Sequence, residues 1–458
     1  MDMDLSEEQE LLRNAAREFL ERECPLSLVR EVERSEPGFS PQLWQQMADL
    51  GWLGVPIPQE YGGFGLGTVD LAVLAKELGR ALCPGPYLPT VVLAAGAIAA
   101  AGTPEQKGTY LPRIIAGETV IAFALQESNG YYDPRGIATR AEAAGDGFVL
   151  NGTKMFVEFA SAADLLLVVA RSAGEAPSPA GLTMFLVNPK SAGVRMTPLP
   201  TMAKDRVQFG RPIGTFQVIQ GYLAQLITEI WGAETLTYFA AGADLLLVVA
   251  RSEGEAPSSE GLTMFLVDPK GTGVTMTPLP TMARDRQYHV VLEGVRVPRE
   301  NVLGPVGQAW SLLEGVVQRG AVTFCAYTVG AAEKMHEMAT NYAKDRVQFG
   351  RPIGSFQLIQ SYLAQLIIEI WGAETLTYYA AWCLDEGLPA RGMIAKAKAF
   401  AGDTIKRTTD IGSQIFGGIG YIEDVDSTLF LRRGKQYQLA MGDTGYWEDI
   451  VAEEILDR

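Results

Sequence analysis

The sequence predicts an α+β protein of several domains, in the order helices, β-domain, helices. Three observations support this order. Apolar residues recur with a helical period over residues 1–120, form short strand-like runs over 121–304, and return to the helical period over 305–458. At 458 residues the chain is also too long for one compact core.

The N-terminal helical domain begins with a clear start signal. Ser6 and Gln9 have the spacing of a capping box, in which each side chain bonds the other residue's main-chain N–H. The apolar residues that follow have helical spacing: Leu11, Leu12, Ala15, Ala16, Phe19 and Leu20. A Gly-rich connection over 56–67 then leads into a second helix from Val69 to Arg80.

The central domain contains several strand signals. The run 121–125 is apolar and compatible with a strand, and 165–170 and 182–187 are typical of buried strands. Asn151–Gly152 predicts a hairpin turn between two strands, because this dipeptide readily adopts the left-handed backbone of a two-residue turn. The run 289–298 closes the domain.

Two stretches of sequence occur twice. Residues 163–206 recur at 243–286 with 8 differences in 44 positions. Residues 203–241 recur at 343–381 with 5 differences in 39 positions. The copies are few, nearly identical and unequally spaced, which is not the pattern of a solenoid.

We interpret residues 207–286 as a duplicated insert that interrupts the β-domain. It consists of a helix copy, 207–242, which repeats part of the C-terminal domain, and a strand copy, 243–286. Without these 80 residues the chain has 378. Arg206 would then be followed by Gln287, as Arg286, its counterpart in the repeat, is in the full chain.

The C-terminal domain contains a helix with the spacing of a bundle helix. Its apolar residues are Ile359, Tyr362, Leu363, Leu366, Ile367 and Ile370.

Composition excludes several classes of protein. The net charge of −16 does not suit binding to nucleic acid. No apolar run reaches the roughly 18–20 residues of a membrane span. Four scattered cysteines without a CxxC motif predict neither a disulfide framework nor a zinc site, and they fit the reducing cytoplasm. The two histidines, His289 and His336, are too few for a His-based metal site, so we expect no metal.

Seven short strings point to one family by their number, order and spacing. They are PQEYGGFGLG (58–67), GTPEQK (102–107), FALQES (123–128), NGTKMFV (151–157), VRVPRENVLG (295–304), DRVQFGRPIGSFQLIQ (345–360) and QIFGGIGY (414–421). Each string is weak alone. Together they show that the chain resembles the acyl-CoA dehydrogenases over nearly its whole length outside the insert.

The resemblance implies a C-terminal four-helix bundle after the helical and β-domains, and assembly as a homo- or hetero-tetramer or a dimer. It implies FAD as cofactor, held between the β-domain and the bundle, with a neighbouring subunit covering the adenine half. The expected reaction, which belongs to fatty acid metabolism, is the α,β-dehydrogenation of an acyl-CoA thioester to the 2-enoyl-CoA. In this reaction a carboxylate removes the α-proton. Electrons would pass to an electron-transfer flavoprotein.

A flavin needs backbone donors at its pyrimidine edge, a flat wall against its ring and charge pairing at its diphosphate. By resemblance, the residues along the isoalloxazine are Phe123, Leu125, Gln126 and Glu127, with Phe156 against the ring. Arg346 and Phe349 would reach the FAD of a neighbouring subunit, with Gln357 nearby. The turn at Gln414, Gly417 and Gly418 would approach the diphosphate, although alone it reads as a helix C-cap.

The sequence departs from the family pattern at three positions near the flavin. Gln126 replaces a usual threonine, and Tyr132 stands where a small serine is usual. Glu158 replaces a second hydroxyl with a charged group two residues after Phe156, where it too would lie beside the cofactor.

The largest departure concerns the catalytic base. The usual glutamate position is Met441, and the alternative position used by some members falls near Gly320. Asp443 is the nearest carboxylate and the candidate base, although a helix N-cap is its simpler interpretation. Glu314 is a weaker candidate.

Three interpretations stay open. The chain is a working acyl-CoA dehydrogenase with an unusual base, or an FAD-binding subunit without its own base, or a non-functional duplicated variant. Other flavin chemistry on the same fold is also compatible with the sequence, because fold does not fix chemistry.

Overall fold

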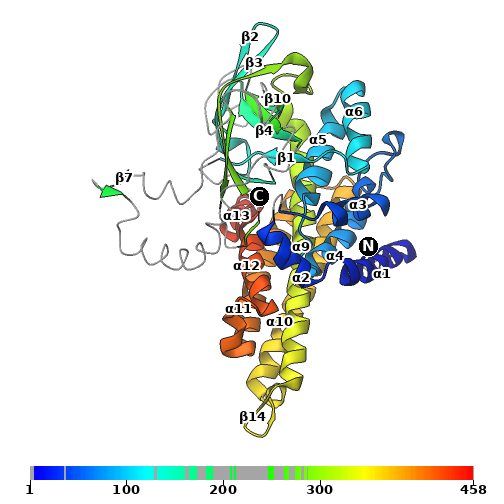
Figure 1. The fold of residues 1–458 in the computed structure, drawn as a ribbon, viewed down its shortest axis with the longest axis vertical. Helices are drawn as coiled ribbons and strands as arrows, with labels where there is room; N and C mark the ends of the chain where they lie inside the picture. The colour runs from blue at the N-terminus through cyan, green and yellow to red at the C-terminus, as the bar shows by residue number, and fades with distance from the viewer. Residues whose placement is uncertain are drawn as a thin grey trace. The chain divides into compact units, whose positions relative to one another are not determined.

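The computed structural model describes residues 5–35, 38–127, 132–159, 164–172, 182–188, 207–208, 211–212, 246–251, 262–267, 274–279, 283–285 and 287–456 (Figure 1). The chain forms two compact units. One comprises Met1–Glu31, Leu66–Cys83 and Val317–Arg458, and the other Val32–Gly65 and Pro84–Val316. Most of the predicted helix copy, 207–242, lies outside the described residues.

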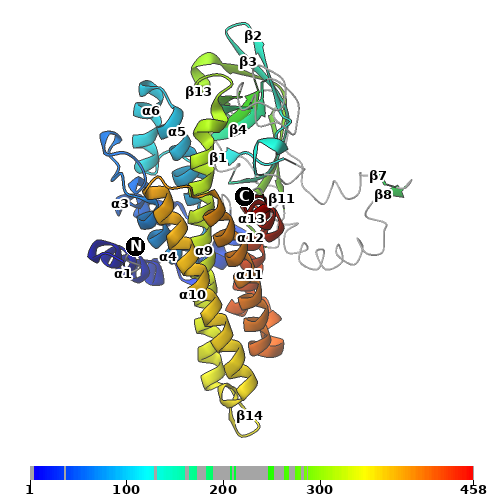
Figure 2. The ribbon, with the colours of Figure 1, turned by 180° about the vertical axis from the view of Figure 1, so that it is seen from behind.

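The first unit is helical. Its helices are α1 (Glu7–Glu23), most of α2 (Leu26–Arg34), α4 (Thr68–Arg80), most of α9 (Ala309–Asp345), α10 (Gln357–Asp385), α11 (Arg391–Phe416), α12 (Asp426–Leu439) and α13 (Thr444–Leu456). A two-stranded hairpin, β14 (Val347–Gln348) and β15 (Arg351–Pro352), joins α9 to α10. Helices α10 and α11 run side by side in both ribbon views (Figures 1 and 2).

Helix α1 starts as predicted. Ser6 Oγ accepts the Gln9 N–H at 3.2 Å, and Gln9 Oε1 accepts the Ser6 N–H at 3.0 Å, which completes the capping box. Arg17 then binds Glu77 of α4 through two hydrogen bonds of 2.9 and 2.7 Å. This bidentate pair fixes α1 against α4, because the carboxylate of Glu77 is almost fully buried.

Helices α4 and α9 cross at two glycines. A Cβ atom at Gly79 would lie 2.0 Å from the Tyr327 carbonyl oxygen, and one at Gly330 would lie 1.9 Å from that of Lys76. Only glycine permits main chains to approach this closely. The N-terminus of α4 is capped by Asp385, whose carboxylate accepts the N–H groups of Thr68 and Val69 at 2.6 and 2.9 Å.

Helix α10 has one buried face with the predicted helical spacing. Its buried residues are Leu366, Ile370, Ala373, Thr377, Ala380, Ala381 and Cys383. The opposite face leaves Leu358, Ile368 and Trp371 exposed.

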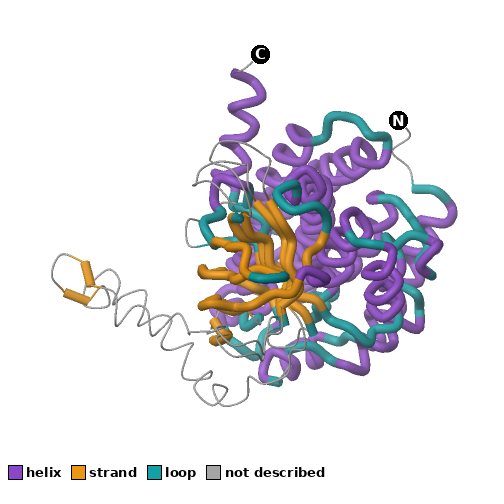
Figure 3. The backbone as a smooth tube through the Cα atoms, turned by 90° about the horizontal axis from the view of Figure 1, so that it is seen from above, coloured by secondary structure: helices purple, strands orange, loops and turns teal. Residues whose placement is uncertain are grey.

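The second unit combines short helices with the β-sheet (Figure 3). Its helices are α3 (Pro41–Asp49), the π-helix η3 (Tyr87–Ala94), α5 (Ala95–Ala101) and α6 (Pro104–Ile115). Its strands are β1 (Ile121–Ala124), β2 (Arg140–Ala144), β3 (Gly147–Glu158), β4 (Leu165–Arg171), β5 (Leu182–Val187), β9 (Leu246–Arg251), β10 (Leu262–Val267), β11 (Val274–Leu279), β12 (Gln287–Pro298) and β13 (Val302–Leu303). A further hairpin of this unit, β7 (Val207–Gln208) and β8 (Arg211–Pro212), has the same sequence and pairing as β14 and β15.

The predicted hairpin at Asn151–Gly152 is wrong. Both residues lie inside β3, and the turn between β2 and β3 is at Gly145–Asp146, where Gly145 has φ +65°. Gly152 is needed for a different reason, since a Cβ atom there would lie 2.4 Å from Thr139 Oγ1. Asn151 Oδ1 instead accepts the Gly294 N–H at 2.7 Å.

The two strand copies occupy equivalent positions in the sheet. Phe123 of β1 is opposite Leu167 of β4 and also opposite Leu247 of β9, the matching residue of the second copy. Val302 of β13 is likewise opposite Phe185 of β5 and opposite its counterpart in β10, residue 265. Both copies therefore pair with the same residues of β1 and β13, and β4 also pairs with β9 in the same sheet.

No helix among the described residues is long and apolar enough to cross a membrane. The order of elements, helices followed by strands followed by helices, confirms the predicted fold class.

Candidate functional site

The residues directly after β1 form a short strip that is tied to β3. Phe123 is half-buried in β1, and the Leu125 side chain is buried. The main-chain carbonyl of Gln126 accepts the Met155 N–H at 2.9 Å. Residues 125–127 are called the flavin strip below, after the role that the resemblance gives them.

A buried ion pair lies under the flavin strip. Lys154 Nζ is 2.6 Å from Glu127 Oε1 and donates to the Leu125 carbonyl at 3.2 Å. The Glu127 carboxylate also accepts the N–H groups of Ala138 and Thr139, at 3.0 and 3.1 Å. This side chain is therefore committed to the interior, so any contact of Glu127 with a flavin would come from its main chain.

Phe156 has an unusual conformation for a strand residue. Its φ is +53°, and its side chain is 40% exposed between the buried Met155 and Val157. A bulky residue in this region carries roughly 1–3 kcal/mol of backbone strain, which concentrates at functional sites. An exposed aromatic ring held this way suits a wall against a flat ligand. Glu158 follows at the end of β3, half-buried.

The hairpin between α9 and α10 brings together three other predicted residues. Arg346 and Phe349 are exposed, Phe349 to 92% with φ +53°, and Gln357 begins α10. The hairpin is held by the Ile353 N–H, which donates to the Arg346 carbonyl at 2.8 Å. Their exposure suits side chains that reach a group outside their own subunit.

The turn after α11 is both a helix cap and an open surface of main chain. Gly417 caps the helix with its N–H on the Gln414 carbonyl and has φ +69°. A Cβ atom at Gly417 or Gly418 would meet nothing within 4 Å. Gly417 is thus required by its backbone conformation, and the main chain of both glycines is accessible to a ligand.

The turn between α12 and α13 contains the predicted base position. Met441 is 6% exposed and has φ +58°, and its carbonyl accepts the Trp447 Nε1–H at 2.8 Å. Asp443 is exposed, and its Oδ1 accepts the Tyr446 N–H at 2.8 Å. That bond is the N-cap of α13, which the sequence offered as the simpler interpretation of Asp443.

A buried lysine supports the same turn. Lys398 of α11 is 1% exposed, donates from Nζ to the Gly442 carbonyl at 3.0 Å, and lies 5.7 Å from the centre of the Phe324 ring. Burial lowers the pKa of Lys398 to about 8, and Cys325 and Asp443 oppose this shift. The other two weighed positions supply little: Gly320 has no side chain, and Glu314 is exposed on α9.

The sequence analysis did not identify Lys154 and Lys398, although a signal existed for each. Lys398 falls at helical spacing with Ile394, Ala401 and Ile405, which are also buried. Lys154 is followed in β3 by three apolar residues, Met155, Phe156 and Val157, the first and third of which are buried. A lysine on an inward face requires a partner, because an unpaired charge is rarely buried.

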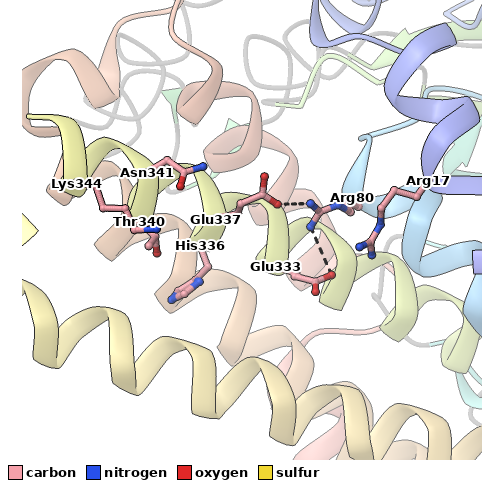
Figure 4. A pocket seen from close by; sticks show the side chains of 8 residues that line it. All are labelled: Arg17, Arg80, Glu333, His336, Glu337, Thr340, Asn341 and Lys344. Carbon is pink, nitrogen blue, oxygen red and sulfur yellow. Dashed lines mark hydrogen bonds and ion pairs between the residues drawn. The ribbon is translucent and has the colours of Figure 1, made fainter. Parts of the chain in front are cut away.

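A cavity of about 350 Å³ in the helical unit is lined by charged and polar side chains (Figure 4). They are Arg17, Arg80, Glu333, His336, Glu337, Thr340, Asn341 and Lys344. Arg80 forms ion pairs with Glu337 and, at 3.6 Å, with Glu333. His336 Nε2 is 2.9 Å from the Leu363 carbonyl oxygen. Most of these charges are paired with one another, and the lining contains none of the predicted site residues.

These features fit a flavin, on three grounds within this chain. A strained and exposed phenylalanine directly follows Met155, which bonds the strip; two glycines leave main chain open; and an exposed arginine lies just before the α9–α10 hairpin. In the part of the chain that the structure describes, no cluster of three or more His, Cys, Asp or Glu side chains is arranged to hold a metal ion.

Three family models match the chain in sequence. "Acyl-CoA dehydrogenase, N-terminal domain" matches residues 6–118, and "Acyl-CoA dehydrogenase, middle domain" matches 122–214. "Acyl-CoA dehydrogenase, C-terminal domain" matches two separate segments, 196–246 and 307–456. The first of these two segments contains the helix copy, in agreement with its likeness to α10.

Similar proteins cover the chain from end to end. "Acryloyl-CoA reductase (NADH)" of Anaerotignum propionicum is 27% identical over 100% of this chain and 97% of its own length. "Caffeyl-CoA reductase-Etf complex subunit CarC" of Acetobacterium woodii is 26% identical over 100% of both chains. The structure of butyryl-CoA dehydrogenase from Megasphaera elsdenii shares the fold, with a TM-score of 0.73, 24% identity and 100% of both chains covered.

Proposed function

The chain belongs to the acyl-CoA dehydrogenase family, and on that premise we propose that it oxidises an acyl-CoA thioester to the 2-enoyl-CoA. It is an oxidoreductase acting on a CH–CH group, with FAD as cofactor. We further propose that an electron-transfer flavoprotein takes up the electrons. The relative named as a subunit of an Etf complex supports this partner.

The observation that supports a flavin site best is that Phe156 directly follows Met155, the residue that bonds the flavin strip. The Met155 N–H fixes the Gln126 carbonyl, and the next residue turns its ring outward at φ +53°. FAD, when bound, supplies the two-electron acceptor of the reaction. The role of these residues is to hold an edge and a flat wall for that ring. Glu158, at the end of β3, would place a negative charge near the same group.

Three further groups would act on the rest of the cofactor. Gln414, Gly417 and Gly418 offer accessible polar groups to its diphosphate. We propose that Arg346 and Phe349 complete the site of a second subunit, with Gln357 beside them, because both side chains are exposed in their own chain. The working protein is then a dimer or tetramer, of one chain or of two related chains.

Asp443 is the residue that we propose as base. A base must reach within about 3 Å of the proton that it removes. Oδ1 of Asp443 caps α13, which leaves Oδ2 as the atom that would take the α-proton.

A second candidate function rests on the same turn. Because Met441 cannot accept a proton and Asp443 already serves as a cap, the chain would then be an FAD-binding subunit without its own base. In that case it would complete the site of a related chain instead of oxidising acyl-CoA alone.

Anaerobic titration separates these functions. The purified protein is expected to be yellow, and butyryl-CoA or octanoyl-CoA is expected to bleach the flavin band. Bound flavin that no acyl-CoA bleaches would favour the second function. A protein that neither contains nor takes up FAD would contradict both.

Two variants test the base. Asp443→Asn keeps a good N-cap, so the fold and bound FAD should persist while bleaching is lost. Bleaching at the wild-type rate would show that Asp443 is only a cap. Met441→Glu places a carboxylate at the usual position, and a gain in bleaching rate would show that the rest of the site is complete.

A further inference from the structure

We propose that Lys154 is the positioning residue of the flavin strip. Its buried ammonium group holds residues 125–127 so that their main chain faces the isoalloxazine. The inference rests on the proposed function, because the flavin role of the strip comes from the family. Lys154 itself would touch neither cofactor nor substrate.

The contacts of Lys154 bracket the middle residue of the strip. Nζ bonds the Leu125 carbonyl on one side of Gln126 at 3.2 Å, and the Glu127 carboxylate on the other side at 2.6 Å. The Lys154 side chain is fully buried, so water does not compete for these bonds. The strip is therefore held at both ends by one cation.

Three consecutive residues of β3, Lys154, Met155 and Phe156, have different roles at the strip. Lys154 holds the ends of the strip, and the Met155 N–H holds its centre through the Gln126 carbonyl at 2.9 Å. Phe156, the next residue, faces outward in a strained conformation. A change in the position of the strip would thus also move the ring that is proposed to stand against the flavin.

Glu127 extends the restraint to a third segment. Its two carboxylate oxygens accept the N–H groups of Ala138 and Thr139, just before β2. The ion pair thereby joins the strip, β3 and residues 138–139. A buried ion pair contributes little stability compared with well-packed apolar residues, so a positional role explains it better than stability does.

The test compares Lys154→Met with the double variant Lys154→Met/Glu127→Gln. The single variant leaves a buried carboxylate unpaired, so its Tm should fall. The double variant removes both charges and keeps one acceptor oxygen, which can serve only one of the two N–H groups at 138–139, so its Tm should recover in part. We expect the Kd for FAD to rise roughly ten-fold or more in both variants, with an altered visible flavin spectrum.

Each other outcome contradicts the proposal. If the double variant recovers FAD affinity together with Tm, the pair is only structural. If Lys154→Met binds FAD with wild-type affinity and spectrum, the strip is held by other groups. Should Lys154→Met not fold, the double variant alone decides between the two roles.

Glu77→Gln serves as the matched control. It also removes the charge of a buried carboxylate from an ion pair, that with the partly exposed Arg17, but in the helical unit. We expect a lower Tm with unchanged FAD affinity; a ten-fold loss of affinity here would mean that any loss of stability weakens FAD binding and would overturn the inference. A wild-type protein that does not bind FAD contradicts the proposed function instead.

Discussion

Three bulky residues hold a left-handed backbone at positions where a function is predicted. Phe156, Phe349 and Met441 have φ of +53°, +53° and +58°. Such a backbone costs about 1–3 kcal/mol at each site and persists only where the surrounding structure enforces it. The sequence contains no local signal for this, since none of the three is a residue that favours positive φ. Family resemblance identified these positions, and the structure shows how they are held.

The strain at Phe156 predicts that replacing this residue with glycine raises the stability of the protein but lowers its affinity for FAD. Phe156→Gly relieves the strain, so the free energy of unfolding of the apoprotein should rise by about 1 kcal/mol. FAD affinity should fall because the ring wall is lost. Urea unfolding and FAD titration measure the two effects. Phe156→Ala is the control, since it removes the ring but keeps the strained backbone of an L-residue.

Lys398 gives a prediction about pH. Burial lowers its pKa from the ordinary 10.5 to about 8, so between these values the unfolded chain binds more protons than the folded one. Stability contributed by this group therefore rises with pH across that window. The penalty for burying the ammonium is fully present below pH 8 and is released as the pH approaches 10.5. This penalty is roughly 3 kcal/mol, because each unit of pKa shift corresponds to about 1.4 kcal/mol.

The measurement compares the wild type with Lys398→Met. Urea unfolding at several values between pH 7 and pH 10 should show that the wild type gains stability relative to the variant. Cys325 does not titrate in that window, because burial raises its pKa to about 12. A constant difference across the window would show that the ammonium is not penalised by burial.

At the scale of elements, local pattern predicted helices and buried strands well and turns less well. The capping box of α1 and the apolar runs of β4 and β5 are short-range signals, and they are confirmed. The hairpin prediction at Asn151–Gly152 was wrong because a glycine can serve either a tight turn or a close approach between chain segments. Here only the position of Thr139 distinguishes the two roles. Thr139 is thirteen residues before Gly152, so its position could not be predicted from the sequence.

The strand repeat gives a prediction at this scale. Leu167 is fully buried in β4, and residue 247 is opposite the same Phe123. The seven residues of β4 are repeated without change in the second copy, as are the six of β5. If the copies are interchangeable, Leu167→Asp and Leu247→Asp should each leave a folded, FAD-binding protein. The double variant should lose both the fold and FAD binding, because both copies of the strand then carry an aspartate that would be buried without a partner.

Far-UV circular dichroism and flavin content report the outcome. A single variant as damaged as the double variant would identify its copy as the sole occupant of the slot. Ala173→Glu is a suitable control, since residue 173 differs between the copies and Glu253 stands at its counterpart.

For the whole molecule, the sequence predicts the order of domains and the family, because both are encoded in many independent positions. It does not predict which copy of a repeated segment is used, because identical residues have identical propensities. The helix copy illustrates this. Of its 5 differences from 343–381, none falls on the buried face of α10, so the copy retains that face: Leu226, Ile230, Ala233, Thr237 and Ala240 match Leu366, Ile370, Ala373, Thr377 and Ala380.

We therefore expect that a chain in which Arg206 is joined to Gln287 is at least as soluble as the full chain and binds FAD at least as well. The α10 slot accepts one helix, and a second apolar face without a slot promotes association. The junction also preserves the start of the pairing between β12 and β3, since Gln287 begins β12 opposite Glu158. Asp205 would replace Asp285, whose Oδ2 accepts the Gln287 side-chain N–H at 2.6 Å. Size-exclusion chromatography and flavin content measure both properties, and loss of either one in the 378-residue chain would show that the insert is structural.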